Sequence, residues 1–198
     1  VEVPLRIAIV SARGAAGYGD FINQLYNNSS RLNFKTHLFE AVMQGERTPT
    51  TIIAALNEIA LQQDEWDCVV IIRGGGATSD LVAFEDYELA LNVAQFPLPI
   101  IIGIGHERDI TVLDYVANMR VKTPTAAAEW LINRGNDALE YLRSMGNAIL
   151  QKVSDRIAGS KEQLSYYEAL LPTAPLTAVE RENARLRSDL MSLAQIGA

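Results

Sequence analysis

The sequence predicts an α/β fold in which a parallel sheet carries helices on both faces and a long helical arm follows. Apolar runs of strand length alternate with segments of helical periodicity as far as Ile104. Beyond that residue the strand-like runs stop, and helical periodicity continues almost to the end of the chain. This order indicates a parallel sheet, because each connection between parallel strands must cross back over one face of the sheet.

Apolar runs rich in β-branched residues mark the predicted strands, which are Leu5–Val10, Lys35–Val42, Cys68–Ile72 and Ile100–Ile104. The segments predicted as helices between them are Asp20–Tyr26, Pro49–Gln63 and Tyr87–Ala94. In the second of these helices, Ile52, Leu56 and Ile59 recur on one face, as expected of a helix packed on a sheet. We therefore expect four or five strands in the flavodoxin-like order.

A short helix is predicted over Thr111–Met119, and the helical arm begins after it. Thr123 is placed to cap the first long helix, and Pro124 fits the first helical position. Apolar or small residues then recur in helical steps at 138, 142, 145, 149, 153, 157, 160, 164, 167 and 171. Pro172 and Pro175 interrupt this stripe before a second amphipathic stretch. We expect an α/β domain over residues 1–134 and the start of a coiled coil over 135–198, whose stripe needs a partner helix.

Charge and cysteine content limit the classes of function. A net charge of −7 disfavours strong non-specific nucleic-acid binding by this chain alone, because such binding depends on Lys and Arg neutralising phosphates. The single cysteine, Cys68, lies in an apolar run and can form no internal disulfide, which favours a reducing, cytoplasmic compartment. No stretch approaches the roughly 20 consecutive apolar residues of a membrane span.

Two glycine-rich loops follow predicted strands, where ligands bind in parallel sheets. The first runs from Ser11 to Asp20, and its carboxylate either caps the next helix or contributes to a site. The second begins Arg73-Gly74-Gly75-Gly76, in which consecutive glycines expose backbone N–H groups beside an arginine. This second loop is either an anion-binding nest or a flexible turn.

A third loop, after the fourth strand, contains His106, Glu107 and Asp109. A His and an Asp at this spacing can form a hydrogen bond that orients the imidazole; alternatively, Asp109 caps a helix and His106 is a surface residue. With Asp20 and Arg73, this pair suits phosphate-ester chemistry: the arginine binds phosphate oxygens, the histidine transfers a proton and a carboxylate positions water. His37 is expected to be structural.

No cofactor is certain from the sequence. Asp20, Glu107, Asp109 and Asp114 offer oxygen ligands for a divalent metal such as Mg²⁺, but they form no closed ligand set.

Several motifs occur in order along the chain: Arg73-Gly74-Gly75-Gly76 with Asp80-Leu81 and Phe84; Gly105-His106-Glu107 with Asp109; and Asp114, Val116-Ala117, Arg120 and Thr123 through Glu129. Together they resemble the large subunit of exodeoxyribonuclease VII, a bacterial nuclease for single-stranded DNA, over roughly Leu5 to Leu131. The chain departs from the family pattern at Ala77, Arg108 and Asn118 and in the first loop.

The resemblance implies exonucleolytic hydrolysis of single-stranded DNA in either direction, giving 5′-phosphorylated products in DNA degradation and repair. The catalytic residues that it implies are Asp20, Arg73, His106 and Asp109. Phosphate binding is expected of Gly74, Gly75 and Gly76, and supporting roles of Ser11, Glu107, Asp114, Arg120 and Thr123. The implied partners are small subunits on the coiled coil and single-stranded DNA. The DNA would be bound mainly by an N-terminal OB-fold, which we expect to lie outside this sequence with the rest of the coiled coil.

Two other interpretations stay open from the residues alone. One is an α/β domain that binds a nucleotide or phosphosugar without hydrolysing it, and the other is a structural assembly module.

Overall fold

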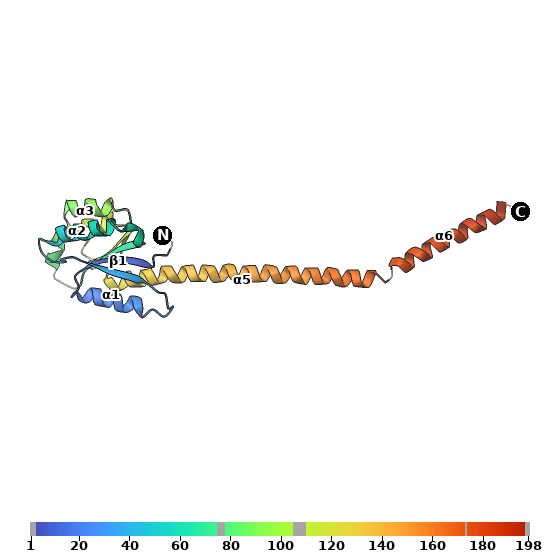
Figure 1. The fold of residues 1–198 in the computed structure, drawn as a ribbon, viewed down its shortest axis with the longest axis horizontal. Helices are drawn as coiled ribbons and strands as arrows, with labels where there is room; N and C mark the ends of the chain where they lie inside the picture. The colour runs from blue at the N-terminus through green and yellow to red at the C-terminus, as the bar shows by residue number, and fades with distance from the viewer. Residues whose placement is uncertain (1–2, 75–77, 105–109, 173, 197–198) are drawn as a thin grey trace. The chain divides into compact units, whose positions relative to one another are not determined.

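A computed structural model describes residues 3–74, 78–104, 110–172 and 174–196 of the chain (Figure 1). The chain divides into two compact units, Val1–Tyr141 and Leu142–Ala198. Unit 1 holds the α/β fold and unit 2 is helical.

The sheet of unit 1 has five strands: β1 (Arg6–Ser11), β2 (Lys35–Glu40), β3 (Cys68–Ile72), β4 (Ile100–Gly103) and β5 (Met119–Arg120). Their order is β2-β1-β3-β4-β5, and each neighbouring pair is parallel. This arrangement confirms the predicted parallel sheet in flavodoxin-like order. The sequence did not predict β5, a short edge strand that pairs with Ile101 and Ile102 of β4.

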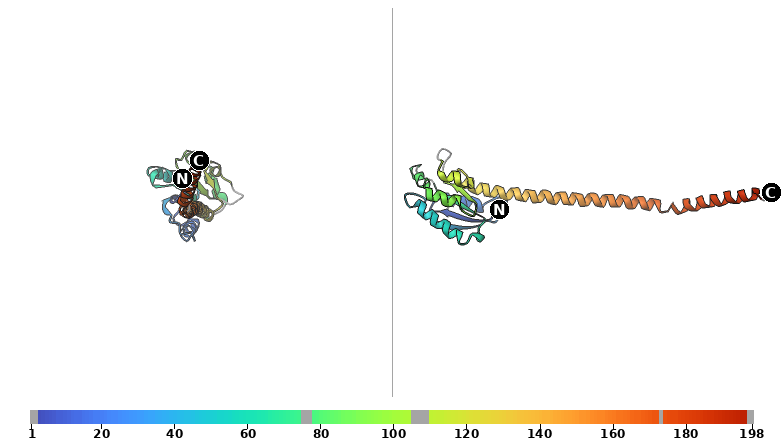
Figure 2. Two further views of the ribbon diagram at one scale, coloured as in Figure 1. Left: turned by 90° about the vertical axis from the view of Figure 1, so that its right-hand side faces the viewer. Right: turned by 90° about the horizontal axis from the view of Figure 1, so that it is seen from above.

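Helices cover both faces of the sheet, as predicted (Figures 1 and 2). The helices on one face are α2 (Thr48–Ala60), α3 (Tyr87–Ala94) and α4 (Val112–Val116), and those on the other are α1 (Ala16–Tyr26) and the start of α5 (Pro124–Leu170). Side chains of β1 alternate between the two cores: Val10 packs under α2, and Ile9 packs under α1. Every residue of β3 is buried, which explains why that strand is a continuous apolar run.

Some predicted boundaries were wrong. Helix α1 begins at Ala16, and Ala15 precedes it without a capping side chain, so Asp20 lies inside the helix and does not cap it. Helix α4 ends at Val116, and β2 ends at Glu40. The 3-10 helices η1 (Gln63–Glu65) and η2 (Thr78–Phe84) were not predicted.

The predicted start of the long helix is confirmed. Pro124 is the first residue of α5, and the backbone N–H of Ala126 donates a hydrogen bond to Thr123 Oγ1 at 3.1 Å. The hydroxyl of Thr123 thus satisfies one of the N–H groups that the first turn of a helix leaves without a partner.

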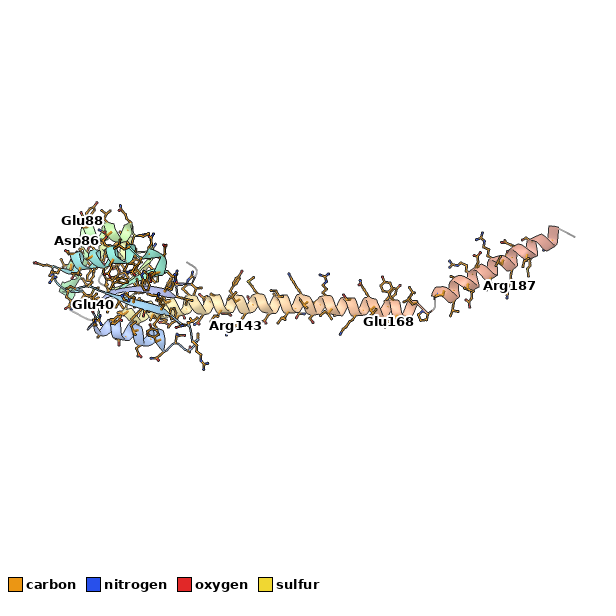
Figure 3. All side chains as sticks on the ribbon, in the orientation of Figure 1. Glu40, Asp86, Glu88, Arg143, Glu168 and Arg187 are labelled. Atoms are coloured by element: carbon orange, nitrogen blue, oxygen red, sulfur yellow. The ribbon has the colours of Figure 1, made fainter. Side chains whose placement is uncertain are left out.

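Unit 2 consists of the rest of α5 and helix α6 (Ala174–Ile196), and Figure 3 shows side chains along both helices. The predicted apolar stripe is exposed on α5 at Leu142, Met145, Ile149, Val153, Ile157, Leu164 and Tyr167. On α6 the exposed apolar residues include Leu176, Val179, Leu186 and Leu190. Within the described part of the chain, none of the helices combines the length and apolar character needed to span a membrane.

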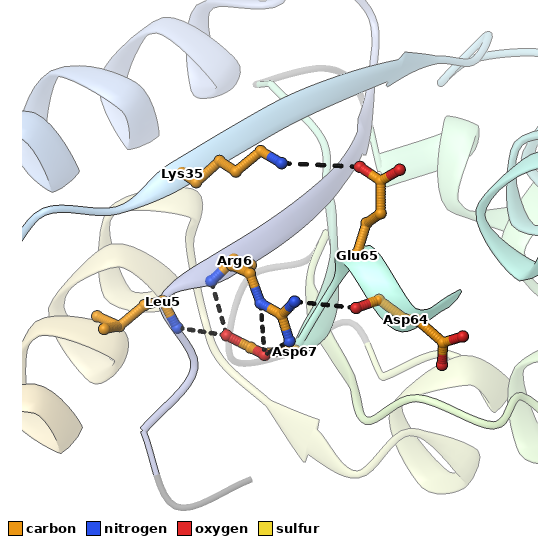
Figure 4. Close-up of polar contacts among 6 residues, drawn as sticks. All are labelled: Leu5, Arg6, Lys35, Asp64, Glu65 and Asp67. Atoms are coloured by element: carbon orange, nitrogen blue, oxygen red, sulfur yellow. Dashed lines mark hydrogen bonds and ion pairs between the residues drawn. The ribbon is translucent and has the colours of Figure 1, made fainter. Parts of the chain in front are cut away.

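Asp67 joins the amino ends of β1 and β3 (Figure 4). Its Oδ2 accepts hydrogen bonds from the backbone N–H groups of Leu5 and Arg6 at 2.9 and 2.8 Å, and its Oδ1 accepts two from the Arg6 guanidinium. Burial raises the pKa of the Asp67 carboxyl, but the hydrogen bonds from Arg6 and Leu5 outweigh it, so the pKa lies below its ordinary value. This network fixes the sheet at the edge opposite the strand ends discussed next.

Candidate functional site

A cavity of about 770 Å³ lies at the carboxyl ends of β1, β2 and β3. Its walls come from Ala12–Ala16 after β1, Glu40–Gln44 around the end of β2, Arg73 and Gly74 after β3, and Thr51 of α2. Strand β1 lies between β2 and β3, so the chain changes direction across the sheet at this point. Ligands of open α/β sheets bind at such switch points, and the cavity falls in the usual range of about 300–1,000 Å³ for small-ligand sites.

Arg73 occupies the β3 side of the cavity and is only 5% exposed. Its backbone N–H donates a hydrogen bond to the carbonyl of Gly103 in β4 at 3.4 Å, which extends the sheet by one residue at this strand end. An arginine remains positively charged at all ordinary pH values. The cavity therefore holds a permanent positive charge that is nearly buried.

The first turn of α1 lies against Gly74. A Cβ added at Gly74 would be 3.2 Å from the backbone nitrogens of both Ala16 and Gly17. The N–H groups in the first turn of a helix have no partner within the helix and carry its partial positive charge. Because Ala15, Ala16 and Gly74 all line the cavity, this end of the cavity favours an anion such as phosphate.

Ser11 holds two strand ends together. Its hydroxyl is fully buried and donates a hydrogen bond to the Ile72 carbonyl at 2.8 Å, joining the last residue of β1 to the last residue of β3. This contact ties the end of β1 to the residue that precedes Arg73.

Asp114 and Arg120 form an ion pair beside β4. The Asp114 side chain is 3% exposed, and its Oδ1 lies 3.3 Å from Arg120 Nε. Its Oδ2 accepts hydrogen bonds from the backbone N–H of Thr111 at 2.8 Å and from the Thr111 hydroxyl at 3.1 Å. Asp114 thus caps α4 and anchors β5. Asn118 has a comparable role, since its Oδ1 accepts a hydrogen bond from the backbone N–H of Ile100 at 2.7 Å.

The structure brings together only some of the predicted site residues. Arg73 and Gly74 line the cavity, whereas Asp20 is exposed in the second turn of α1 and is not part of the lining. The remaining predicted residues, Gly75, Gly76, His106, Glu107 and Asp109, lie outside the described residues, so their grouping with Arg73 stays a prediction. Among the residues that the structure describes, no three His, Cys, Asp or Glu side chains gather closely enough to hold a metal ion.

Sequence reasoning missed Arg13 and Glu40, which line the cavity from the ends of β1 and β2. Arg13 Nε donates a hydrogen bond to Glu40 Oε1 in an ion pair. That hydrogen bond and the negative charge of Glu40 raise the pKa of Arg13 above its ordinary value. Both residues follow the general rule that ligands of parallel sheets bind at the carboxyl ends of the strands. The rule brings Arg13 and Glu40 together only when β2 is known to lie beside β1.

The fold and the cavity define a doubly wound α/β domain with a switch-point site suited to an anionic ligand. The profile of the family described as "Exonuclease VII, large subunit" matches residues 1–197, and the chain belongs to that family.

Individual relatives agree with this assignment. The chain is 32% identical to the exodeoxyribonuclease 7 large subunit of Nitrosomonas eutropha over 195 residues, covering 98% of this chain and 41% of the relative. It is 32% identical to the protein of that name from Lactobacillus helveticus over 162 residues (82% and 36%) and 38% identical to that from Deinococcus radiodurans over 130 residues (64% and 31%). The chain therefore spans between 31% and 41% of the length of these relatives.

Proposed function

We propose that this chain contributes the catalytic domain of an exonuclease that hydrolyses phosphodiester bonds in single-stranded DNA, in either direction, and releases 5′-phosphorylated products. The observation that carries the proposal is the placement of Arg73 and Gly74 beside the first turn of α1 in the switch-point cavity. Family membership supports it, because the relatives carry the name exodeoxyribonuclease 7 large subunit.

In this proposal Arg73 binds the non-bridging oxygens of the scissile phosphate. Charge-assisted hydrogen bonds from arginine to phosphate are strong, and the nearly buried position strengthens them further because water screens charges less there. The backbone N–H groups of Gly74, Gly75 and Gly76 and the first turn of α1 add donors to the same anion.

The proton transfers are assigned to the loop after β4. His106 acts as the general acid or base, and Asp109 orients its imidazole. Asp20 is exposed in α1 and outside the cavity lining, so we assign it no part in positioning water. Of the four carboxylates that offer oxygen ligands for Mg²⁺, Asp114 is already engaged by Thr111 and Arg120 and Asp20 lies outside the cavity lining, so Glu107 and Asp109 would supply the ligands here. Turnover measured with and without a chelator separates metal-assisted from metal-free hydrolysis.

The proposal includes two kinds of partner. Small subunits would cover the exposed apolar stripe of α5, since such a stripe is buried in a coiled coil by a partner helix. Single-stranded DNA would be held mainly by an OB-fold outside this sequence, because the chain carries a net charge of −7. We place the reaction in the cytoplasm.

The test uses the full-length large subunit assembled with its small subunit and end-labelled single-stranded DNA. Arg73→Ala should lower kcat by about 10²–10³, as does removal of a donor to a developing negative charge. His106→Ala should lower the rate by about 10²–10⁴. Arg31→Ala controls for the loss of one arginine charge, because Arg31 is exposed in the loop before β2. Wild-type turnover in a folded Arg73→Ala or His106→Ala enzyme would remove that residue from the mechanism.

A further inference from the structure

The cavity contains a second arginine, whose environment differs from that of Arg73. The Arg13 side chain is 79% exposed and is paired with Glu40, which is 52% exposed. The pair joins the loop after β1 to the last residue of β2, the end of the sheet where Figure 3 labels Glu40. Arg73, by contrast, is nearly buried. The cavity thus has a nearly buried arginine, Arg73, and an exposed arginine at its rim, Arg13, whose side chain can change partners.

The ion pair leaves Arg13 able to bind another anion. The contact with Glu40 uses the Nε–H, and a guanidinium has five N–H donors in all. Exposed ion pairs contribute little to stability because water and salt screen them, so exchanging the carboxylate for a phosphate disturbs the fold very little. Arginine also matches phosphate geometry, since it can offer two parallel N–H donors.

We propose that Arg13 is a second phosphate-binding residue of this cavity, held at the rim by Glu40 until the phosphate of a nucleotide displaces the carboxylate. The ligand class is a nucleotide phosphate, either within the DNA strand or on the released product. The proposal rests on the function proposed above and adds to it a binding residue, Arg13, and a positioning residue, Glu40.

The two members of the pair should act in opposite directions. Arg13 attracts the phosphate, whereas Glu40 both competes for Arg13 and repels the phosphate. Removing Arg13 therefore weakens binding, and neutralising Glu40 strengthens it. An ion pair that only stabilised the fold would give the same effect on stability for either change and no effect on affinity.

The test is made on the full-length large subunit assembled with its small subunit. The Kd for thymidine 5′-monophosphate is measured by calorimetry, which needs no hydrolysis, with thymidine as the ligand that lacks phosphate. Arg13→Ala should raise this Kd about 3- to 10-fold, and Glu40→Gln should lower it about 2- to 5-fold, as expected of exposed charges. Both changes should shrink at high salt. On single-stranded DNA the same variants should shift KM in the same directions, with smaller changes in kcat.

A matched control pair lies at the other end of the same strand. Lys35 and Glu65 form an ion pair of 3.7 Å with similar exposure, 63% and 58%, at the amino end of β2. Lys35→Ala and Glu65→Gln should leave the Kd and KM at the wild-type values.

The outcomes separate this inference from the proposed function. If the wild type is an active nuclease but Arg13→Ala and Glu40→Gln leave Kd and KM unchanged, the inference is overturned and the proposed function stands. Opposite shifts in Kd without nuclease activity support the inference while the function fails. Shifts of both variants in the same direction, or equal affinities for thymidine and its monophosphate, also overturn it.

Discussion

Gly17 and Gly74 pack backbone against backbone at the carboxyl edge of the sheet. A Cβ at Gly17 would lie 2.9 Å from Gly74 Cα and 2.7 Å from the carbonyl oxygen of Arg73. These distances are too short for any side chain at residue 17, so the first turn of α1 reaches the end of β3 only because that residue is glycine, whereas a Cβ at Gly74 would meet its nearest neighbours at 3.2 Å. A glycine inside a helix costs about 0.5–1 kcal/mol relative to alanine, and this contact is the structural reason to accept that cost.

We expect Gly17→Ala to destabilise unit 1 by about 1–3 kcal/mol and to displace Arg73, because the added methyl meets backbone atoms that lie at a strand end. Gly19→Ala is the control in the same helix: a Cβ there meets nothing within 4 Å, so the substitution should stabilise by about 0.5–1 kcal/mol. Urea unfolding measures both changes. Equal stability of the two variants would contradict the proposed contact.

Much of this fold could be predicted from the sequence, and the failures have physical causes. Buried parallel strands such as β3 are apolar on both faces and stand out in any sequence. Strand β5 could not be found because it is short and half-buried, so it has no periodicity; it exists through its pairing with β4 and the contact of Arg120 with Asp114. The start of α1 was hidden because Ala15 is not a capping residue.

The candidate site was predictable only in part. Arg73 and Gly74 follow a recognisable strand, and such positions point to the ligand-binding edge whatever the order of strands. The Arg13 and Glu40 pair depends on which strands are neighbours, which no local pattern reveals. The participation of His106 and Asp109 stays a prediction.

The second prediction concerns Asp67. Its carboxylate accepts backbone and side-chain hydrogen bonds that join two strands. Hydrogen bonds to charged groups stabilise a fold more than those between neutral groups, so we expect Asp67→Ala to lower the free energy of unfolding by about 2–4 kcal/mol. Asp67→Asn keeps one oxygen acceptor and should lose about half as much. Fluorescence of the buried Trp66 can follow unfolding in urea. An Asp67→Ala variant as stable as the wild type would refute this assignment.

The lowered pKa of Asp67 predicts the pH dependence of this effect. A carboxyl whose pKa is lower in the folded state stabilises fully above its unfolded pKa of about 3.9, and that contribution disappears as pH falls through the folded pKa. The stability difference between wild type and Asp67→Asn should therefore be constant from neutral pH to about pH 5 and shrink below about pH 4. A difference that grew on acidification would contradict the direction of the shift.

The third prediction concerns the thiol of Cys68. Burial raises its pKa to about 12, and the negative charge of the neighbouring Asp67 contributes a smaller part of this increase. We expect thiol reagents to modify the native chain at pH 8 only as fast as it unfolds, because both thiolate formation and access are blocked. Denaturant should restore the reactivity of an ordinary cysteine, and fast labelling without denaturant would contradict the buried position.

This raised pKa also has a consequence at alkaline pH. The neutral thiol is compatible with burial, so its contribution to stability is complete below the unfolded pKa of about 8.5. It declines as pH rises from there toward the folded value of about 12, because the unfolded chain loses its proton first. Cys68→Ala should remove this part of the alkaline destabilisation, as measured by thermal midpoints at pH 8 and pH 10.

The last prediction separates a structural from a catalytic part for Asp114. Its carboxylate caps α4 through Thr111 and pairs with Arg120, so Asp114→Ala should cost about 2–4 kcal/mol, the sum of a lost cap and an arginine left without its partner. The matched control is Asp86, which caps α3 through the backbone N–H of Leu89 at 2.8 Å and is not part of an ion pair among the described residues. Asp86→Ala should therefore cost only about 0.5–2 kcal/mol.

Asp114→Asn preserves the cap geometry and removes the negative charge, so its turnover tests whether that charge takes part in the reaction. If Asp114 only shapes the fold, a folded Asp114→Asn variant should retain the proposed activity on single-stranded DNA to within a few-fold. A loss on the order of 10² or more in that folded variant would instead place the carboxylate among the groups that act on the phosphate.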